Sequence, residues 1–204
     1  MGNGWHEWPL VLFTVLGQCV AGGVIGTGLV WMANEGDRRG QLHIVRSQFF
    51  LWLLMGIGFV ASMMHLGSPL RAFNSLNRIG ASALSNEIAA GSLFFAIGGI
   101  WWLLNWLGKM PAGLGRIWLL ISMVSGVLFV WAMTRVYQIE TVPTWHNGYT
   151  TASFFLTMLI GGPLLAALLL RLVGIRFPAS RFAAISAIAL LASAAVVMMQ
   201  SMQL

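Results

Sequence analysis

Residues 46–66 read RSQFFLWLLMGIGFVASMMHL, an apolar stretch with no ionisable residue between Arg46 and His65. About 20 apolar residues, rising 1.5 Å each in a helix, cross roughly 30 Å of hydrocarbon. The bilayer interior has no water to hydrogen-bond the backbone, so a stretch of this kind must be helical there. The segment therefore predicts one transmembrane helix, and the same pattern recurs along the chain.

The whole sequence of 204 residues has this character, with 58% hydrophobic residues, 8% charged residues and a mean hydropathy of +0.83. A soluble domain has about 25% charged residues, so this composition cannot cover a surface that faces water. We predict an all-α integral membrane protein, a bundle of six transmembrane helices that forms a single domain over residues 1–204. The predicted spans are about 10–33, 46–66, 87–107, 116–138, 151–171 and 182–202.

The basic residues predict the orientation of the bundle. The net charge of +6 could suggest nucleic acid, but these residues lie in short connections between spans, where they set topology, so no nucleic-acid partner is expected. The even-numbered connections hold three of the 11 basic residues, and the odd-numbered ones hold the other eight. This bias puts the odd-numbered connections in the cytoplasm and both termini outside. The eight residues are Arg38, Arg39, Arg46, Lys109, Arg116, Arg171, Arg176 and Arg181.

Cysteine and histidine usage limits the cofactors that this protein can hold. Cys19 is the only cysteine, so the protein cannot form an internal disulfide or hold an iron–sulfur cluster by itself. A haem buried between spans usually takes two axial histidines, and only His65 lies near a span. We therefore expect neither haem nor metal in this chain.

Most tryptophans lie near the predicted span ends, where an amphipathic ring is stable at the membrane interface. We interpret them as interface anchors without a chemical role. The residues so interpreted are Trp5, Trp8, Trp31, Trp101, Trp102, Trp106, Trp118 and Trp145.

The connection between the second and third spans reads HLGSPLRAFNSLNRIGASALSNE over residues 65–87. Ser68 can cap a helix that begins at Pro69, and Gly80 suits its end. The apolar residues between them share one face, so a short amphipathic helix at the outer interface is predicted. Arg71 and Arg78 would then face lipid headgroups or a partner protein.

An ionisable residue stands at each end of this connection, at the same expected membrane depth. His65 could be a neutral, hydrogen-bonded interface residue, and Glu87 could be a first-turn acid favoured by the helix dipole. Their pairing across one hairpin favours a functional role for both. A carboxylate beside an imidazole stabilises its protonated form, so His65 would be a competent base near neutral pH. We interpret the pair as a proton-accepting site for a lipid-soluble reductant.

Small residues flank both members of the pair. Ser62 lies three positions before His65, and Gly91 and Phe94 follow Glu87 on one helix face. Small residues in membrane helices usually mark close helix contacts, and this interpretation is favoured from the sequence. The alternative is a slot for a flat ring, with Phe94 as a wall. In that case Ser62, Gly91, Phe94 and Arg71 line the site with His65 and Glu87.

Three segments of the sequence resemble the DmsC family, the membrane anchor subunits of dimethyl-sulfoxide-reductase-type enzymes. They are GWHEWPL at 4–10, HLGSPLRAFNSLNRIGASALSNEI at 65–88 and TVPTWHNGYT at 141–150. The resemblance implies a haem-free subunit of the bacterial inner membrane that binds and oxidises menaquinol to menaquinone. It implies that electrons pass to an iron–sulfur subunit and then to a molybdopterin catalytic subunit. It also implicates His65 and Glu87 in the quinol site.

Members of this family normally continue for two further spans, whereas this sequence ends at Leu204 after the sixth, so we expect a C-terminally shortened member. Two alternative functions predict different features. A passive anchor or assembly subunit would bind its partners without a quinol site. A small transporter would require polar residues along mid-membrane faces, and few are present apart from Gln18.

Overall fold

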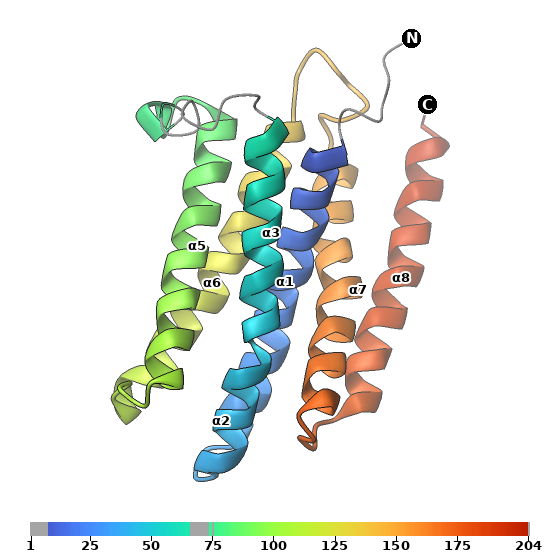
Figure 1. Cartoon of the computed structure of the whole chain (residues 1–204). Coiled ribbons are helices and arrows are strands. Elements are labelled where there is room, and N and C mark those ends of the chain that lie inside the picture. The colour runs from blue at the N-terminus through green and yellow to red at the C-terminus, as the bar shows by residue number, and fades with distance from the viewer. Residues whose placement is uncertain (1–7, 66–73, 75, 204) are drawn as a thin grey trace.

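The computed structural model describes residues 8–65, 74 and 76–203. This part of the protein is helical and contains no strand (Figure 1). Six helices are long and apolar enough to cross a membrane, with α2 and α3 counted together. The elements are α1 (Trp8–Ala33), α2 (Arg38–Ser47), α3 (Phe49–His65), η2 (Leu76–Arg78), α5 (Ala83–Trp106), α6 (Ala112–Tyr137), α7 (Gly148–Leu172) and α8 (Ala179–Ser201).

Each predicted span coincides with one of these long helices, but every helix begins earlier than expected, the second by the largest margin. The second begins at Arg38 as α2, where Asp37 caps its first turn by accepting a hydrogen bond from the Gly40 N–H at 3.1 Å. The third begins at Ala83 rather than at Glu87. Polar residues before each apolar stretch extend the helix beyond the hydrophobic segment that hydropathy detects.

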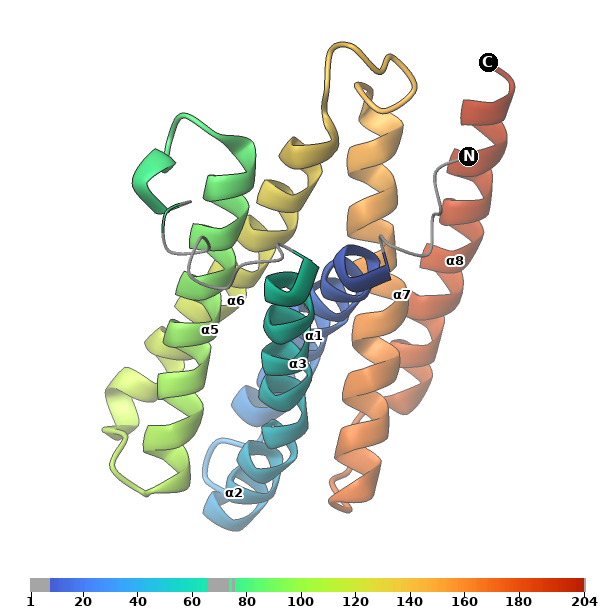
Figure 2. The same cartoon turned by 45° about the horizontal axis from the view of Figure 1, so that its top comes forward.

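α1 lies at the centre of the bundle, in contact with α3, α6 and α7, while α5 packs beside α6 and α8 beside α7 (Figures 1 and 2). Glycine permits the closest of these approaches. A Cβ built on Gly22 of α1 would lie only 2.6 Å from the carbonyl oxygen of Met158 on α7. The start of α1 and the end of α8 lie at the same end of the bundle (Figure 1).

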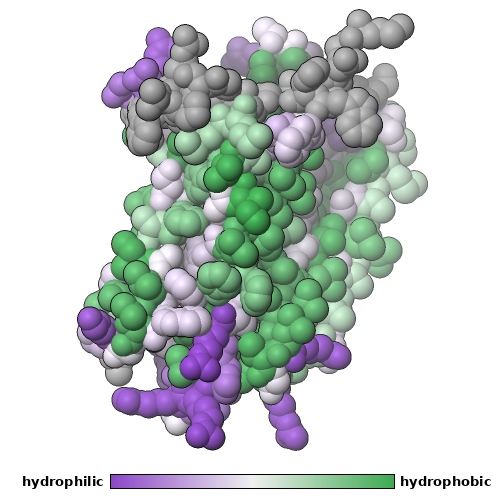
Figure 3. Space-filling view, viewed as in Figure 1, coloured by the Kyte–Doolittle hydropathy of each residue, from purple (hydrophilic) through white to green (hydrophobic). Residues whose placement is uncertain are grey.

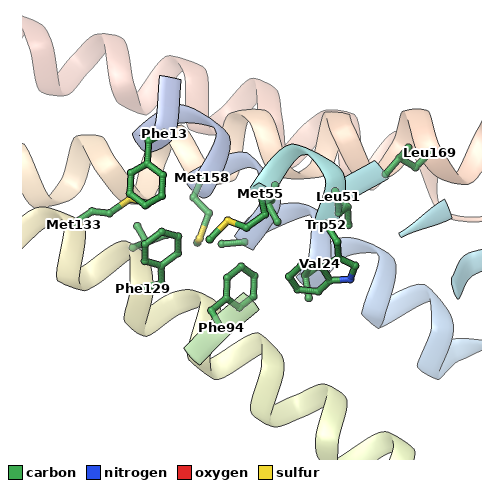
Figure 4. Close-up of a cluster of buried hydrophobic side chains, with 13 residues drawn as sticks. Phe13, Val24, Leu51, Trp52, Met55, Phe94, Phe129, Met133, Met158 and Leu169 are labelled. Carbon is green, nitrogen blue, oxygen red and sulfur yellow. The ribbon is translucent and has the colours of Figure 1, made fainter. Parts of the chain in front are cut away.

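Aromatic rings fill the space between α1, α3, α5 and α6 (Figure 4). Phe94 is completely buried, with its ring 5.3 Å from that of Trp52 and 6.0 Å from that of Phe129. Phe129 also contacts Phe13 at 5.8 Å. These rings link four helices into one core.

The sides of the bundle expose mainly apolar residues, as expected for a surface against lipid (Figure 3). Charged residues gather at the end that holds α2, the α5–α6 connection and the α7–α8 connection, which we call the α2 end (Figures 1 and 3). All eight basic residues of the odd-numbered connections lie there. The odd-numbered connections, which hold most of the basic residues in the sequence, therefore lie together at one end of the bundle.

Several tryptophans at the α2 end connect helices rather than facing the interface. Trp101 is buried and donates from Nε1 to the Gly115 carbonyl at 2.8 Å. Its ring contacts Trp31, which is also buried. The prediction of an interface position is therefore wrong for these two residues, because each indole packs between helices. It agrees with exposed Trp106.

Candidate functional site

A ring contact sets the relative depth of the two predicted site residues. Phe59 on α3 meets Phe95 on α5 edge to face, with ring centroids 5.9 Å apart. The helices run in opposite directions, so α3 ends where α5 begins (Figure 1). From this level the backbone rises about 9 Å to His65 and about 12 Å to Glu87, at 1.5 Å per residue. The two backbones therefore lie within one helical turn of the same depth.

Glu87 is the buried acid at this end of the bundle. The residue is 2% exposed, and its Oε1 atom has no hydrogen-bond partner among the described residues. A buried polar atom without a partner is destabilising, so it usually has a further role, such as binding a ligand or water. Glu87 is thus a buried group free to accept a hydrogen bond.

The start of α5 removes the alternative explanation for Glu87. The first helical turn begins at Ala83 and contains no acid, so Glu87 lies in the second turn, where the helix dipole has little effect. The backbone enters the helix through a turn at Gly80, which has φ +90° and donates its N–H to Asn86 Oδ1 at 2.7 Å. Glu87, in the helix that follows this turn, is buried inside the bundle.

The residues one and two turns further along α5 face a filled space. A Cβ built on Gly91 would lie 2.8 Å from the ring of Phe129 and 3.2 Å from that of Phe59. Phe94 is enclosed by Trp52 and Phe129. These contacts match the close-packing interpretation of the small residues. Any space for a ligand must therefore lie on the Glu87 side of Gly91, towards the helix ends.

The side chains of two predicted site residues, His65 and Arg71, lie outside the described part of the structure. His65 is the last residue of α3, but its side chain lies outside the described part of the structure. Arg71 and the start of the predicted 69–79 helix lie outside the described residues as well. Ser62 is partly buried on α3, one turn before His65. The predicted helix end at Gly80 agrees with its positive φ.

A second polar group lies inside the bundle, at residues that the sequence did not mark as a site. Gln48 is fully buried at the break between α2 and α3, and its Nε2 donates to Thr27 Oγ1 of α1 at 3.0 Å. The Gln48 Oε1 and Trp52 Nε1 atoms have no partner among the described residues. The sequence signal that could have identified this group is a glutamine, Gln48, inside an apolar segment. Within the described residues, no group of three or more His, Cys, Asp or Glu side chains could hold a metal ion.

The fold and its charge distribution define a multi-pass α-helical membrane protein. The family model described as DMSO reductase anchor subunit (DmsC) matches residues 1–204, and the chain belongs to this family. As an anchor subunit it partners with other subunits of the reductase.

Curated relatives agree with this assignment. The protein is 66% identical over 204 residues to the YnfH subunit of an anaerobic dimethyl sulfoxide reductase of Escherichia coli, with all of this sequence and 72% of the relative covered. It is 57% identical over 206 residues to the C subunit of the anaerobic dimethyl sulfoxide reductase of the same organism, with the same coverage. The C subunit from Haemophilus influenzae is 47% identical over 170 residues, which are 83% of this sequence and 61% of that relative. No solved structure matches this sequence.

Proposed function

We propose that this protein binds menaquinol at the shared end of α3 and α5 and oxidises it to menaquinone. The observation that carries the proposal is the buried Glu87 carboxyl, whose Oε1 has no partner among the described residues. It lies at the depth of the end of α3, where His65 stands. A quinol hydroxyl is a hydrogen-bond donor that matches such an acceptor.

The chemistry divides between the two residues. His65 accepts the proton of one quinol hydroxyl, and Glu87 accepts a hydrogen bond or the second proton from the other. Two electrons leave the ring for an iron–sulfur subunit and continue to a molybdopterin catalytic subunit, where the terminal acceptor is reduced. Arg71 and Ser62 are assigned to the rim of the ring site, while Gly91 and Phe94 support its floor through the aromatic core.

We also propose that the membrane is the bacterial inner membrane and that the α2 end faces the cytoplasm. The eight basic residues at this end support the assignment through the positive-inside rule. Both termini and the α3–α5 site then face outward. Quinol protons are therefore released on the outer side.

Replacement of the two residues tests the quinol site in the assembled reductase. His65→Gln and Glu87→Gln should each lower quinol-dependent reduction of the terminal acceptor at least tenfold, because a proton or hydrogen-bond acceptor is lost. Electron delivery from a water-soluble dye that reduces the iron–sulfur subunit directly should be unchanged. His146→Gln and Glu140→Gln are matched controls, since both residues are exposed in another connection at the same end. Unchanged quinol turnover in both site variants contradicts the proposal.

A passive anchor without its own quinol site is the second candidate. The aromatic packing over Gly91 favours it, because those rings occupy space that a deeper slot would need. The two candidates differ in the binding of a quinol analogue to the reductase. Affinity that falls in Glu87→Gln supports the quinol site, whereas affinity that does not change with Glu87 or His65 supports the passive anchor.

A further inference from the structure

A cavity opens at the α2 end, opposite the proposed quinol site. It has a volume of about 840 Å³ and is enclosed by the end of α1, by α2, by the α5–α6 connection and by the first turn of α6. Ligand sites in proteins commonly have volumes of about 300–1,000 Å³. The cavity is therefore large enough for a small polar group with part of an attached acyl tail.

The ionisable side chains that line this cavity carry a net positive charge. Arg38 and Arg116 are cationic, and Glu35 is the single acid among the lining residues. Arg116 pairs with Glu35 at 3.3 Å, and both side chains are more than half exposed, so the pair is weak. The Arg38 side chain forms no hydrogen bond or ion pair with the described residues, which leaves one cation unmatched.

The other polar side chains of the cavity already have partners in the protein. Gln41 donates from Nε2 to the Trp31 carbonyl at 3.1 Å, and Asn105 donates from Nδ2 to the Trp101 carbonyl at 2.8 Å. They hold the wall in place and do not neutralise Arg38. The charge of the cavity therefore favours an anion.

The backbone adds to this preference. α6 begins after Pro111, whose side chain forms no capping hydrogen bond, and Gly113 of the first turn lines the cavity. First-turn N–H groups and the positive end of the helix dipole favour anions. Arg116 lies in the same helix one turn later. This part of the wall therefore presents both backbone N–H donors and a guanidinium group.

The depth and the apolar lining identify the kind of anion. Leu42, Val45 and Met110 line the cavity together with the polar residues, beside the ends of membrane-spanning helices. Phospholipid headgroups occupy this level of a bilayer. We propose that the cavity binds the phosphodiester group of an anionic phospholipid, with Arg38 and Arg116 on the phosphate. The apolar wall then contacts the glycerol and the first part of an acyl tail.

Lipid titration of the purified protein in detergent, followed by native mass spectrometry, tests this proposal. Phosphatidylglycerol should bind more tightly than zwitterionic phosphatidylcholine. Arg38→Gln and Arg116→Gln should each weaken phosphatidylglycerol binding about fivefold, the effect of one basic residue near anionic lipid. Arg38→Lys keeps the charge and should keep most of the affinity. Arg176→Gln is the matched control, because Arg176 lies at the same end but does not line the cavity.

Glu35 provides a variant that should gain affinity. Glu35→Gln removes the acid that pairs with Arg116, so phosphatidylglycerol should bind about fivefold more tightly. A purely structural role for the ion pair predicts no such gain. Equal binding of the two lipids, or no change in Arg38→Gln, Arg116→Gln and Glu35→Gln, overturns the proposal. Competition by inorganic phosphate at concentrations equal to those of the lipid also overturns it, because the anion is then a free phosphate.

Discussion

The amide of Gln48 and the hydroxyl of Thr27 form a buried hydrogen bond of 3.0 Å between the α2–α3 break and α1. The Thr27 hydroxyl in turn donates to the Gly23 carbonyl at 2.8 Å. A polar network of this kind crosses a helix interface where neighbouring side chains are apolar. It fixes the position at which α2 continues into α3.

Thr27→Val should therefore destabilise the bundle, because valine keeps the shape of threonine but leaves the Gln48 amide without its acceptor. The expected loss in free energy of unfolding is about 0.6–1.7 kcal/mol, the range for side-chain hydrogen bonds between membrane helices. Unfolding of the purified protein by denaturing detergent measures it. Thr14→Val is the matched control, since the Thr14 hydroxyl donates to the Leu10 carbonyl of its own helix and to no other helix among the described residues. Equal losses in the two variants would contradict the prediction.

Gly22→Ala should disrupt the contact between α1 and α7. The added methyl group would lie 2.6 Å from a backbone carbonyl and 2.7 Å from the Gly162 Cα atom, and backbone cannot move as a flexible side chain can. We expect a loss of several kcal/mol, or failure to accumulate in the membrane. Gly99→Ala faces open space and should be neutral. Protein yield and midpoint of thermal unfolding compare the two, and a stable Gly22→Ala bundle would show that the helices can separate without loss.

Glu87→Met should leave the stability unchanged or raise it by about 1 kcal/mol, even though the residue is buried. The substitution removes a buried oxygen that has no partner among the described residues, and methionine fills a similar volume. Thermal unfolding of the protein tests this, with Thr27→Val as a reference for a destabilising change. A loss as large as that of Thr27→Val would mean that Glu87 has a structural role.

The proposed orientation predicts a pattern of cysteine labelling in intact cells. In a Cys19→Ser background, Thr141→Cys should react with a reagent that cannot cross the inner membrane, while Arg39→Cys should react only after the membrane is permeabilised. Both positions are exposed, at opposite ends of the bundle. The reverse pattern would invert the orientation and place the proposed quinol site on the cytoplasmic side.

Hydropathy was sufficient to predict the six long helices, because the length of an apolar segment is set by the bilayer. It could not predict which helices touch, since lipid and protein core are equally apolar and the periodicity of a surface helix is absent. Leu51 and Leu53 look equivalent in sequence, yet Leu51 is fully buried and Leu53 is 46% exposed. The central position of α1 was likewise not predictable.

Only part of the candidate site around Glu87 could be predicted from the sequence. The chemistry of Glu87 and its position near a span end follow from the sequence, but its burial depends on how α5 begins. Ser85 and Asn86 look like loop residues, whereas Ser85 is a buried helix residue. The cavity near Arg38 and Arg116 could not be foreseen either, because these residues are 78 positions apart in the sequence.

The central position of α1 has a consequence for biogenesis. It is synthesised before α6 and α7, two of its main neighbours. Its glycine-lined flank must stay uncovered in the bilayer until Gly162 has been synthesised and inserted. Chaperones that bind newly inserted membrane helices can therefore act on α1 throughout this interval. Premature termination before α7 would leave this surface of α1 uncovered and accessible to proteases.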